Sequence, residues 1–262
     1  MKNLFRHTID ELEKLVQELF LNFPQPVPVP YGDYFVFRHP SSAKDDILAS
    51  FLKTVRIVSL LNASLCLLEK GYTQESYILC RAIHEAIEDI TFLAHSTDGP
   101  RPSDDQKKLL KEFYQEELDN PSDPLSSASR DRVGRKKIRA AMSLIPINAG
   151  DPHTIRTTIK AIDQLFSGFV HGAYVFIMEM YGGSPPRYHM RGMSGTPRIS
   201  ECEKNFVNHL YRSILVVEAV AYRAQCKDVA LRAKGLSKIF AGTTGCLDGI
   251  AIQRLKGRIK HG

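Results

Sequence analysis

The segment "LCRAIHEAIEDITFLAH", residues 79–95, brings together side chains that can transfer protons or bind anions. Arg81, His84, Glu85 and Glu88 recur at helical spacing, and at 100° per residue they lie on one side of the predicted helix. The apolar side of that helix comprises Leu79, Ile83, Ala86, Ile87, Ile90 and Leu93. This pattern permits a chemical site in which Arg81 holds a phosphate and Glu85 orients the guanidinium.

Ordinary amphipathicity is the alternative explanation for the same helix. An Arg81–Glu85 pair at i,i+4 on a solvated face would contribute only about 0.3–0.5 kcal/mol. Tyr77 and Phe92 also lie on the polar side, and a face that contacts only water rarely carries two aromatic rings. Both interpretations therefore stay open.

A second candidate lies in "FSGFVHGAY", residues 166–174. His171 shares a helix face with Ser167, and Gly168 and Gly172 flank this face. Because a glycine inside a helix costs roughly 1 kcal/mol relative to alanine, the two glycines predict close approach of another helix or a ligand. His171 is therefore a candidate acid–base or phosphate-contacting group that converges with Arg81 and Glu85. A histidine satisfied within the core is the alternative.

Two segments are rich in basic residues, and the second one interleaves them with Tyr188 and His189. Basic residues mixed with aromatic rings suit phosphate contact and base stacking. A solvated surface and a disordered loop are the alternative. The net charge of +6 is compatible with RNA or another polyanion without requiring one. The candidate nucleic-acid-binding residues are Arg130, Arg132, Arg135, Lys136, Lys137, Arg187 and Arg191.

Several common motifs are missing from the sequence. It contains no glycine-rich nucleotide loop, no H-E-x-x-H motif and no G-x-S-x-G motif, so we expect no cofactor and no metal. The five cysteines include no C-x-x-C pair, which favours a reducing cytoplasm over a disulfide framework. No apolar run reaches the roughly 18–20 residues that span a bilayer, and the N-terminus lacks signal-peptide features. We therefore expect a cytoplasmic protein without a membrane contact.

Hydrophobic periodicity of 3.6 residues predicts helices along nearly the whole chain. The predicted helices cover approximately 8–21, 46–70, 74–95, 106–119, the basic segment after 130, 153–181 and 200–226. Segment 31–40 is predicted to be a packed connector, and 182–198 an irregular loop. The predicted fold class is all-α, with a single helical bundle domain over 1–235 and a basic C-terminal extension over 236–262. Its central pair is 46–70 and 74–95, antiparallel across "GYT".

The helix "ILCRAIHEAIEDITFLA", followed much later by "SGFVHGAY", resembles a group of uncharacterised prokaryotic all-helical proteins. In that group an Arg-x-x-x-Glu helix pairs with a Ser-x-x-x-His helix. The group looks like a distant branch of the HEPN superfamily, helical proteins of toxin–antitoxin and antiviral systems. The resemblance covers mainly residues 44–181, and it implies that Arg81, Glu85, Ser167 and His171 form the site.

The resemblance also implies a metal-independent endoribonuclease that acts on RNA, with a second copy, an antitoxin or another protein as partner. HEPN ribonucleases carry an Arg and a His separated by four to six residues on one helix near a dimer interface. In this chain no Arg precedes His171 at that spacing, and the match in the right order is Arg254 with His261.

Two functions of different classes follow from these patterns. In an RNA-directed enzyme, Arg81 would stabilise developing negative charge and His171 would activate the 2′-hydroxyl or protonate the leaving oxygen. In a non-catalytic binding, regulatory or scaffold protein, the same polar residues would form a buried network that fixes how the helices pack. The distance between Arg81 and His171 distinguishes the two functions, because the enzyme requires these side chains to lie close together.

Overall fold

Helices make up most of the chain in the computed structural model, which describes residues 1–95, 102–116, 118–120, 123, 125–126, 131–143 and 152–246. The helices are α1 Lys2–Phe20, α2 Asp46–Glu69, α3 Thr73–Ala94, α4 Asp104–Tyr114, α5 Arg135–Met142, α6 Pro152–Val170, α7 Tyr174–Met178, α8 Pro197–Arg223 and α9 Lys227–Thr244, with a 3-10 turn at Ser41–Ala43. Two short antiparallel hairpins accompany them, β1 Val27–Tyr31 with β2 Tyr34–Arg38, and β3 Tyr181–Gly182 with β4 Arg187–Tyr188. The predicted mainly α-helical fold is confirmed.

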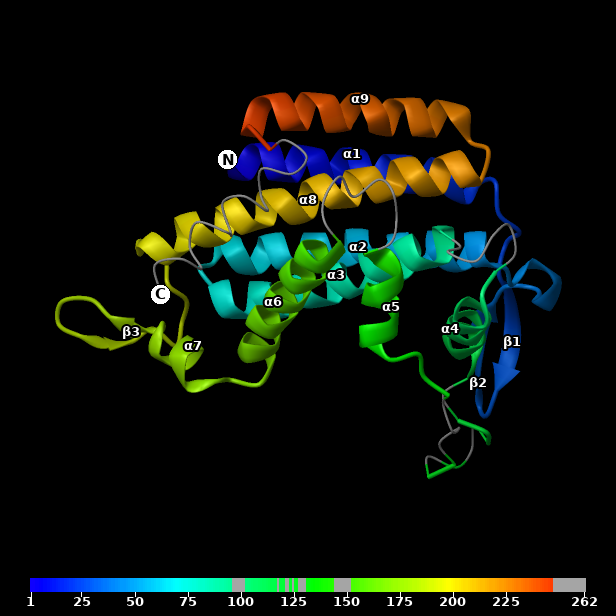
Figure 1. Cartoon of the computed structure of the whole chain (residues 1–262), viewed down its shortest axis with the longest axis horizontal. Helices are drawn as coiled ribbons and strands as arrows, with labels where there is room; N and C mark the ends of the chain where they lie inside the picture. The colour runs from blue at the N-terminus through cyan, green and yellow to red at the C-terminus, as the bar shows by residue number, and fades with distance from the viewer. Residues whose placement is uncertain are drawn as a thin grey trace.

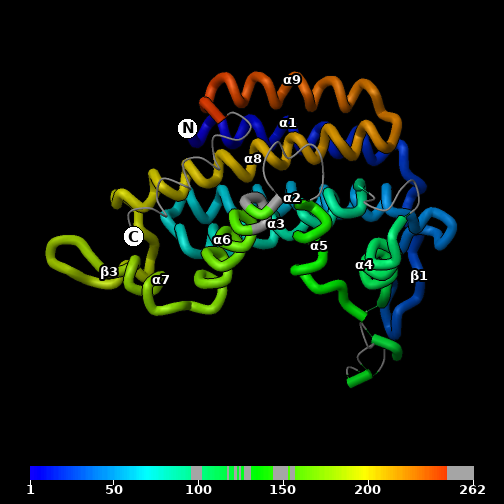
Figure 2. Tube along the Cα trace, viewed as in Figure 1, coloured from blue at the N-terminus to red at the C-terminus, as the bar shows by residue number. Residues whose placement is uncertain are grey.

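Five long helices of the core, α1, α2, α3, α8 and α9, run side by side (Figure 1). The first helix and the last described helix are neighbours, since α1 packs against both α8 and α9 (Figure 2). The helices α5 and α6 lie outside this group and cross α3, with which both are in contact. At one end of the molecule lie α4 and the β1–β2 hairpin, and at the other end lie α7 and the β3–β4 hairpin.

The predicted central pair is present as α2 and α3, which pack against each other more extensively than any other two elements. Asp45 begins α2 by accepting a hydrogen bond from the Leu48 amide at 2.7 Å, which is a standard N-cap. Gly71 follows α2 with φ +87° and allows the tight reversal into α3. By length and composition α2 could span a membrane, but half of its apolar window is buried inside this protein.

The main core is continuous across α1, α2, α3, α6, α8 and α9. Its largest fully buried side chains include Phe5, Phe206 and Phe240, and the Phe5 and Phe206 rings meet edge to face at 5.2 Å. A smaller cluster joins the end of α3 to α4 and α5 through Phe92, Leu109 and Ile138. These two clusters determine where the polar faces of α3 lie.

Segment 27–38 is a β-hairpin, so the prediction of a packed connector was wrong there. Its register pairs Val29 with Val36 and Tyr31 with Tyr34 across a two-residue turn, in which Gly32 has φ +60°. Pro28 and Pro30 lack an amide hydrogen, so they occupy positions of β1 that do not donate to β2. The partner of β2 is therefore the adjacent proline-rich segment, β1.

The predicted helix 153–181 is interrupted, because α6 ends at Val170 and α7 begins at Tyr174. Gly172 has φ +58° and lies in the turn between them. Gly168 does mark a close approach, as predicted, since a Cβ there would lie 2.0 Å from the Phe176 ring of α7. The chain thus folds back on itself at this point.

The expected boundary between 235 and 236 lies within α9, which continues to Thr244. Ala233, Ser237 and Phe240 of this helix are buried against the main core. Small residues such as Ala233 and Ser237 let α9 approach its neighbours closely but contribute little hydrophobic signal to the sequence. The remainder of the expected extension, 247–262, lies outside the described residues, as do Arg254 and His261.

Candidate functional site

Arg81 and Glu85 form the predicted pair on α3, with Arg81 Nε donating to Glu85 Oε1 at 2.9 Å. Both side chains are half-buried. Arg135 at the start of α5 joins them, donating to the Glu85 backbone carbonyl at 3.3 Å and lying 3.8 Å from its carboxylate. Within the described part of the chain, Nη1 of Arg81 is buried without a hydrogen-bond partner.

The other two polar residues of the opening segment, His84 and Glu88, are buried. Arg212 of α8 donates to Nδ1 of His84 at 2.8 Å, so Nδ1 is the acceptor and the ring proton lies on Nε2. That nitrogen is 3.2 Å from Glu88 Oε1 but makes no hydrogen bond to it. Glu88 is therefore held mainly by its other contacts.

Arg139 of α5 supplies those contacts, donating to the two Glu88 carboxylate oxygens at 2.8 and 3.3 Å. It also donates to Asp163 of α6 at 2.8 Å. We call His84, Glu88, Arg139, Asp163 and Arg212 the buried network. Its members come from four helices, so the network joins α3, α5, α6 and α8 through charge-assisted hydrogen bonds.

The protonation states of the buried network follow from its surroundings. Burial alone would raise the pKa of Glu88, but the adjacent His84 ring and the hydrogen bonds from Arg139 outweigh it and lower the pKa to about 2. Burial and the nearby Arg212 guanidinium lower the pKa of His84. The same two causes hold the pKa of His209, on α8, well below its ordinary value. Glu88 is thus ionised at neutral pH, and both histidines are uncharged.

Aromatic side chains of α6 close this region from solvent. The Phe166 ring lies 6.2 Å from the His84 ring and 5.4 Å from the His209 ring. Phe169 stacks on Tyr77 at 4.5 Å, and the Tyr77 hydroxyl accepts a hydrogen bond from Asn205 of α8. A substrate cannot reach Glu88, whose exposed fraction is 0%, so the buried network acts on helix packing rather than on a ligand.

Ser167 and His171 do not join Arg81 and Glu85. The His171 side chain is exposed just past the end of α6, and its backbone amide donates to the Ser167 carbonyl at 3.0 Å. Of the four predicted catalytic residues, Arg81 and Glu85 are paired, and among the described residues no hydrogen bond or ion pair links Ser167 or His171 to that pair.

A cleft of about 1040 Å³ lies beside Glu85, between the β1–β2 hairpin, α4 and the start of α5. Its basic residues are Arg38, Lys44, Lys53, Arg132 and Arg135, and its acidic residues are Glu85, Asp89, Glu112 and Glu116. Asp89 at the floor is buried and binds both Lys53, at 2.8 Å, and Arg135. Arg38 and Glu116 form a two-pronged ion pair at the rim, with 2.6 Å for each bond.

Aromatic rings alternate with the cations of this cleft. Lys53 Nζ lies 4.8 Å from the centre of the Phe113 ring, and Lys44 Nζ lies 5.7 Å from that of Tyr114. Both distances fall within the range of cation–π attraction. Phe37 of β2 also lines the cleft and is 69% exposed. The cleft therefore offers flat apolar faces next to positive charge.

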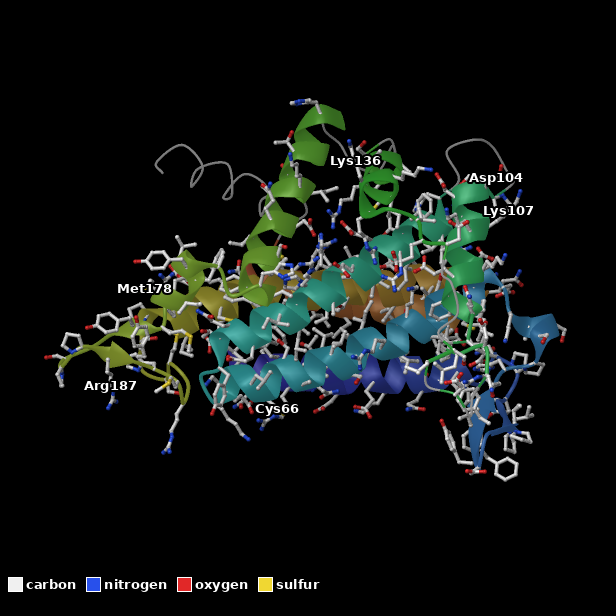
Figure 3. The ribbon with its side chains drawn as sticks, turned by 90° about the horizontal axis from the view of Figure 1, so that it is seen from below. Cys66, Asp104, Lys107, Lys136, Met178 and Arg187 are labelled. Atoms are coloured by element: carbon white, nitrogen blue, oxygen red, sulfur yellow. The ribbon has the colours of Figure 1, made fainter. Side chains whose placement is uncertain are left out.

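The predicted nucleic-acid-binding residues do not share one surface. Arg132 and Arg135 line the cleft, whereas Lys136 is exposed outside it and Lys137 pairs with Asp105 at 3.1 Å. Arg187 lies at the far end of the molecule from α4 (Figure 3). Arg191 follows the same hairpin and is exposed, and Arg130 lies outside the described residues.

Sequence reasoning did not select Arg38, Lys44 or Lys53 as candidate site residues. Lys53 nevertheless interrupts the most apolar run of the chain, and a charged residue at such a position could have identified it as a candidate site residue. Within the described part of the chain, no group of three or more His, Cys, Asp or Glu side chains is arranged to hold a metal ion.

Comparison of the chain with protein families, with curated proteins and with solved structures finds no match. Fold and site together define a mainly α-helical protein with a buried ionic network and an adjoining cleft of mixed charge. Function must be argued from that geometry.

Proposed function

We propose that the protein is a helical RNA-binding protein, built as one bundle domain, and that single-stranded RNA occupies the cleft beside Glu85. The observation that carries this proposal is the alternation of five basic side chains with Phe37, Phe113 and Tyr114 in the cleft lining. Single-stranded nucleic acids bind to grooves in which cations follow the backbone and aromatic faces stack on bases.

The ion pairs at the rim of the cleft differ from those at its floor. Arg38 and Glu116 are both partly exposed, and Arg132 is largely exposed beside a more covered Glu112. Ion pairs that are open to solvent contribute only about 0–1 kcal/mol. A phosphate can therefore take the place of either carboxylate at little cost. Lys53 and Arg135 are held by the buried Asp89, so their role is to maintain the shape of the floor.

A regulatory or scaffold role without catalysis fits the position of the polar residues. The buried network uses His84, Glu88 and Arg139 to hold helices together, and Phe166 covers it. A buried polar network was the alternative to an enzyme that the sequence suggested. The buried network is of that kind, although it does not contain Arg81 or His171. In this proposal RNA binding at the cleft is the activity, and the network keeps α3 and α5 in position beneath it.

Replacing Arg132 and Lys44 together with serine tests the proposal. We expect weaker binding of a labelled single-stranded RNA, and a salt dependence of log K that is shallower by about 1.4, since each phosphate contact on a single strand contributes about 0.7. Fluorescence anisotropy over a series of KCl concentrations measures both. Lys136→Ser is the matched control, because it removes an exposed cation outside the cleft. Equal affinity of the double variant and the control would rule out the cleft.

An endoribonuclease of the kind that the HEPN resemblance implies is the second candidate, and His39 is the observation that favours it. His39 lines the cleft, and its Nδ1 is 2.9 Å from the Pro24 carbonyl oxygen. Because a carbonyl only accepts, Nδ1 carries the proton and Nε2 is free to act as a base.

If the protein cleaves RNA, His39→Ala is expected to lower the cleavage rate about 10²–10⁴-fold, while RNA affinity and melting temperature change little. His171→Ala is expected to leave cleavage, binding and melting temperature as in the parent, because that side chain is exposed and does not line the cleft. Gel analysis of labelled RNA fragments gives the rates. Loss of cleavage in His171→Ala, with His39→Ala active, would restore the assignment made from the sequence.

A further inference from the structure

The end of the molecule opposite the cleft exposes many apolar side chains. Tyr174 and Val175 of α7 are 76% and 61% exposed, and Met190 is 77% exposed. Val170, Ile177, Tyr181 and Tyr188 are exposed beside them. We call these seven residues the end surface. Scattered single apolar residues on a protein surface need no explanation, but seven exposed ones within residues 170–190, two of them in ring contact, indicate a binding surface.

The segment that carries the end surface is firmly attached to the rest of the protein. Phe176 packs on Phe169 with ring centres 4.2 Å apart, and its carbonyl accepts a hydrogen bond from Gln74 of α3. Met193 is buried, and its amide donates to the Gly71 carbonyl at 2.7 Å. The exposure of the apolar side chains is thus a property of the fold rather than of a loose loop.

Positive charge accompanies the apolar residues. Residues 180–197 contain Arg187 and Arg191 and no Asp or Glu, and both arginines are exposed. The acidic residues that flank this segment, Glu179 and Glu201, lie 3.5 and 2.8 Å from Arg198. The end surface therefore combines an uncovered apolar area with net positive charge.

The β3–β4 hairpin, which carries Tyr181 and Tyr188, projects beyond the ends of the long helices (Figures 1 and 3). Val175, Ile177 and Met190 gain from leaving water but offer no face on which a base can stack. Tyrosines favour the boundary between water and hydrocarbon, where the ring is apolar and the hydroxyl stays hydrated. Exposed arginines next to such residues match an anionic lipid surface.

We propose that the end surface docks the protein onto anionic phospholipid membranes, with Val175, Ile177 and Met190 entering the interface and Arg187 and Arg191 contacting lipid phosphates and carboxylates. The contact is peripheral and needs no spanning segment. It is independent of RNA binding at the cleft, which lies at the other end of the molecule. The partner chemistry is a negatively charged bilayer surface.

Flotation of the full chain with vesicles tests the proposal. We expect binding to vesicles of phosphatidylcholine with 30 mol% phosphatidylserine, on the order of the anionic content of a cytoplasmic leaflet, and little binding to phosphatidylcholine alone. Replacing Arg187 and Arg191 with serine is expected to weaken binding roughly 25-fold, about fivefold for each charge. Added salt is expected to weaken binding of the parent as well.

Val175→Asp combined with Met190→Asp is expected to abolish vesicle binding without lowering the melting temperature, since both positions are exposed. The matched control is Ile239→Asp on α9, where the side chain is 68% exposed but lies outside the end surface. No binding of the parent to anionic vesicles, or equal loss in the control, would overturn the proposal. So would weaker RNA binding of the double arginine variant without any lipid binding, which would assign the surface to RNA.

Discussion

Replacing Glu88 with alanine is expected to lower the free energy of unfolding by about 3–5 kcal/mol, the range found when one partner of a buried ion pair is removed. Glu88 is fully buried and receives two hydrogen bonds from Arg139. Without the carboxylate, the guanidinium keeps Asp163 as a partner but loses two hydrogen bonds and remains largely desolvated. Equilibrium unfolding in urea, monitored by circular dichroism, measures the change.

Glu85→Ala is the matched control for this prediction. Glu85 lies one helical turn from Glu88 on the same helix, but it is half-buried, and its ion pairs with Arg81 and Arg135 are partly exposed. We expect a loss of no more than about 1 kcal/mol, as for other exposed pairs. Similar losses in the two variants would show that burial of the network does not determine its contribution to stability.

The sequence predicts the helices around this network well, because α2 and α3 are long, strongly apolar on one side and joined by a short turn at Gly71. The Arg81–Glu85 pair is equally local, since both residues lie on one helix. What the sequence cannot show is which polar residues of α3 are buried. Glu85 and Glu88 look alike on a helical wheel, and only the crossing of α5 and α6 over α3 separates them.

The partners of Glu88 also explain why the site was placed differently from the sequence. Arg139 is 51 residues away in the chain, and in the sequence it is one of several cations in a basic segment that suggests nucleic-acid contact. His171 follows an amphipathic pattern that would continue as a helix, but the turn at Gly172 ends α6 there and leaves the imidazole in solvent. Long-range packing, rather than local periodicity, decided both outcomes.

Exposed apolar residues are a second reason why the fold prediction from the sequence was partly wrong. Phe35 and Phe37 of β2, and Tyr174 and Val175 of α7, are largely exposed, although their types favour burial. Sequence reasoning therefore treated 31–40 as a packed connector and 153–181 as one packed helix. The sequence-based prediction thus failed in two segments at opposite ends of the molecule. These segments contribute to the surfaces for which we propose RNA and an anionic membrane as partners.

Stability is expected to fall as the pH is lowered from 7 to 5, and His209 is expected to be a main cause. The pKa of His209 is well below the ordinary value of 6.5 in the folded chain, so the unfolded chain binds a proton that the folded chain does not. The stabilisation is fully present above the unfolded pKa and is lost as the pH falls below it. The His84 pKa is lowered in the same direction, and Glu88, with a pKa of about 2 against 4.5 when unfolded, extends the loss to lower pH.

His209→Leu isolates this effect. Near pH 5 one proton taken up on unfolding changes the free energy of unfolding by about 1.4 kcal/mol per pH unit. In the variant, the slope of the unfolding free energy against pH is expected to be smaller by about this amount. Urea unfolding at half-unit steps between pH 5 and 7 gives the slope directly. His171→Leu is the control, because its imidazole is in solvent in the folded chain as it is in the unfolded chain. A pH dependence unchanged in His209→Leu would mean that the His209 ring is charged, or open to water, beneath Phe166.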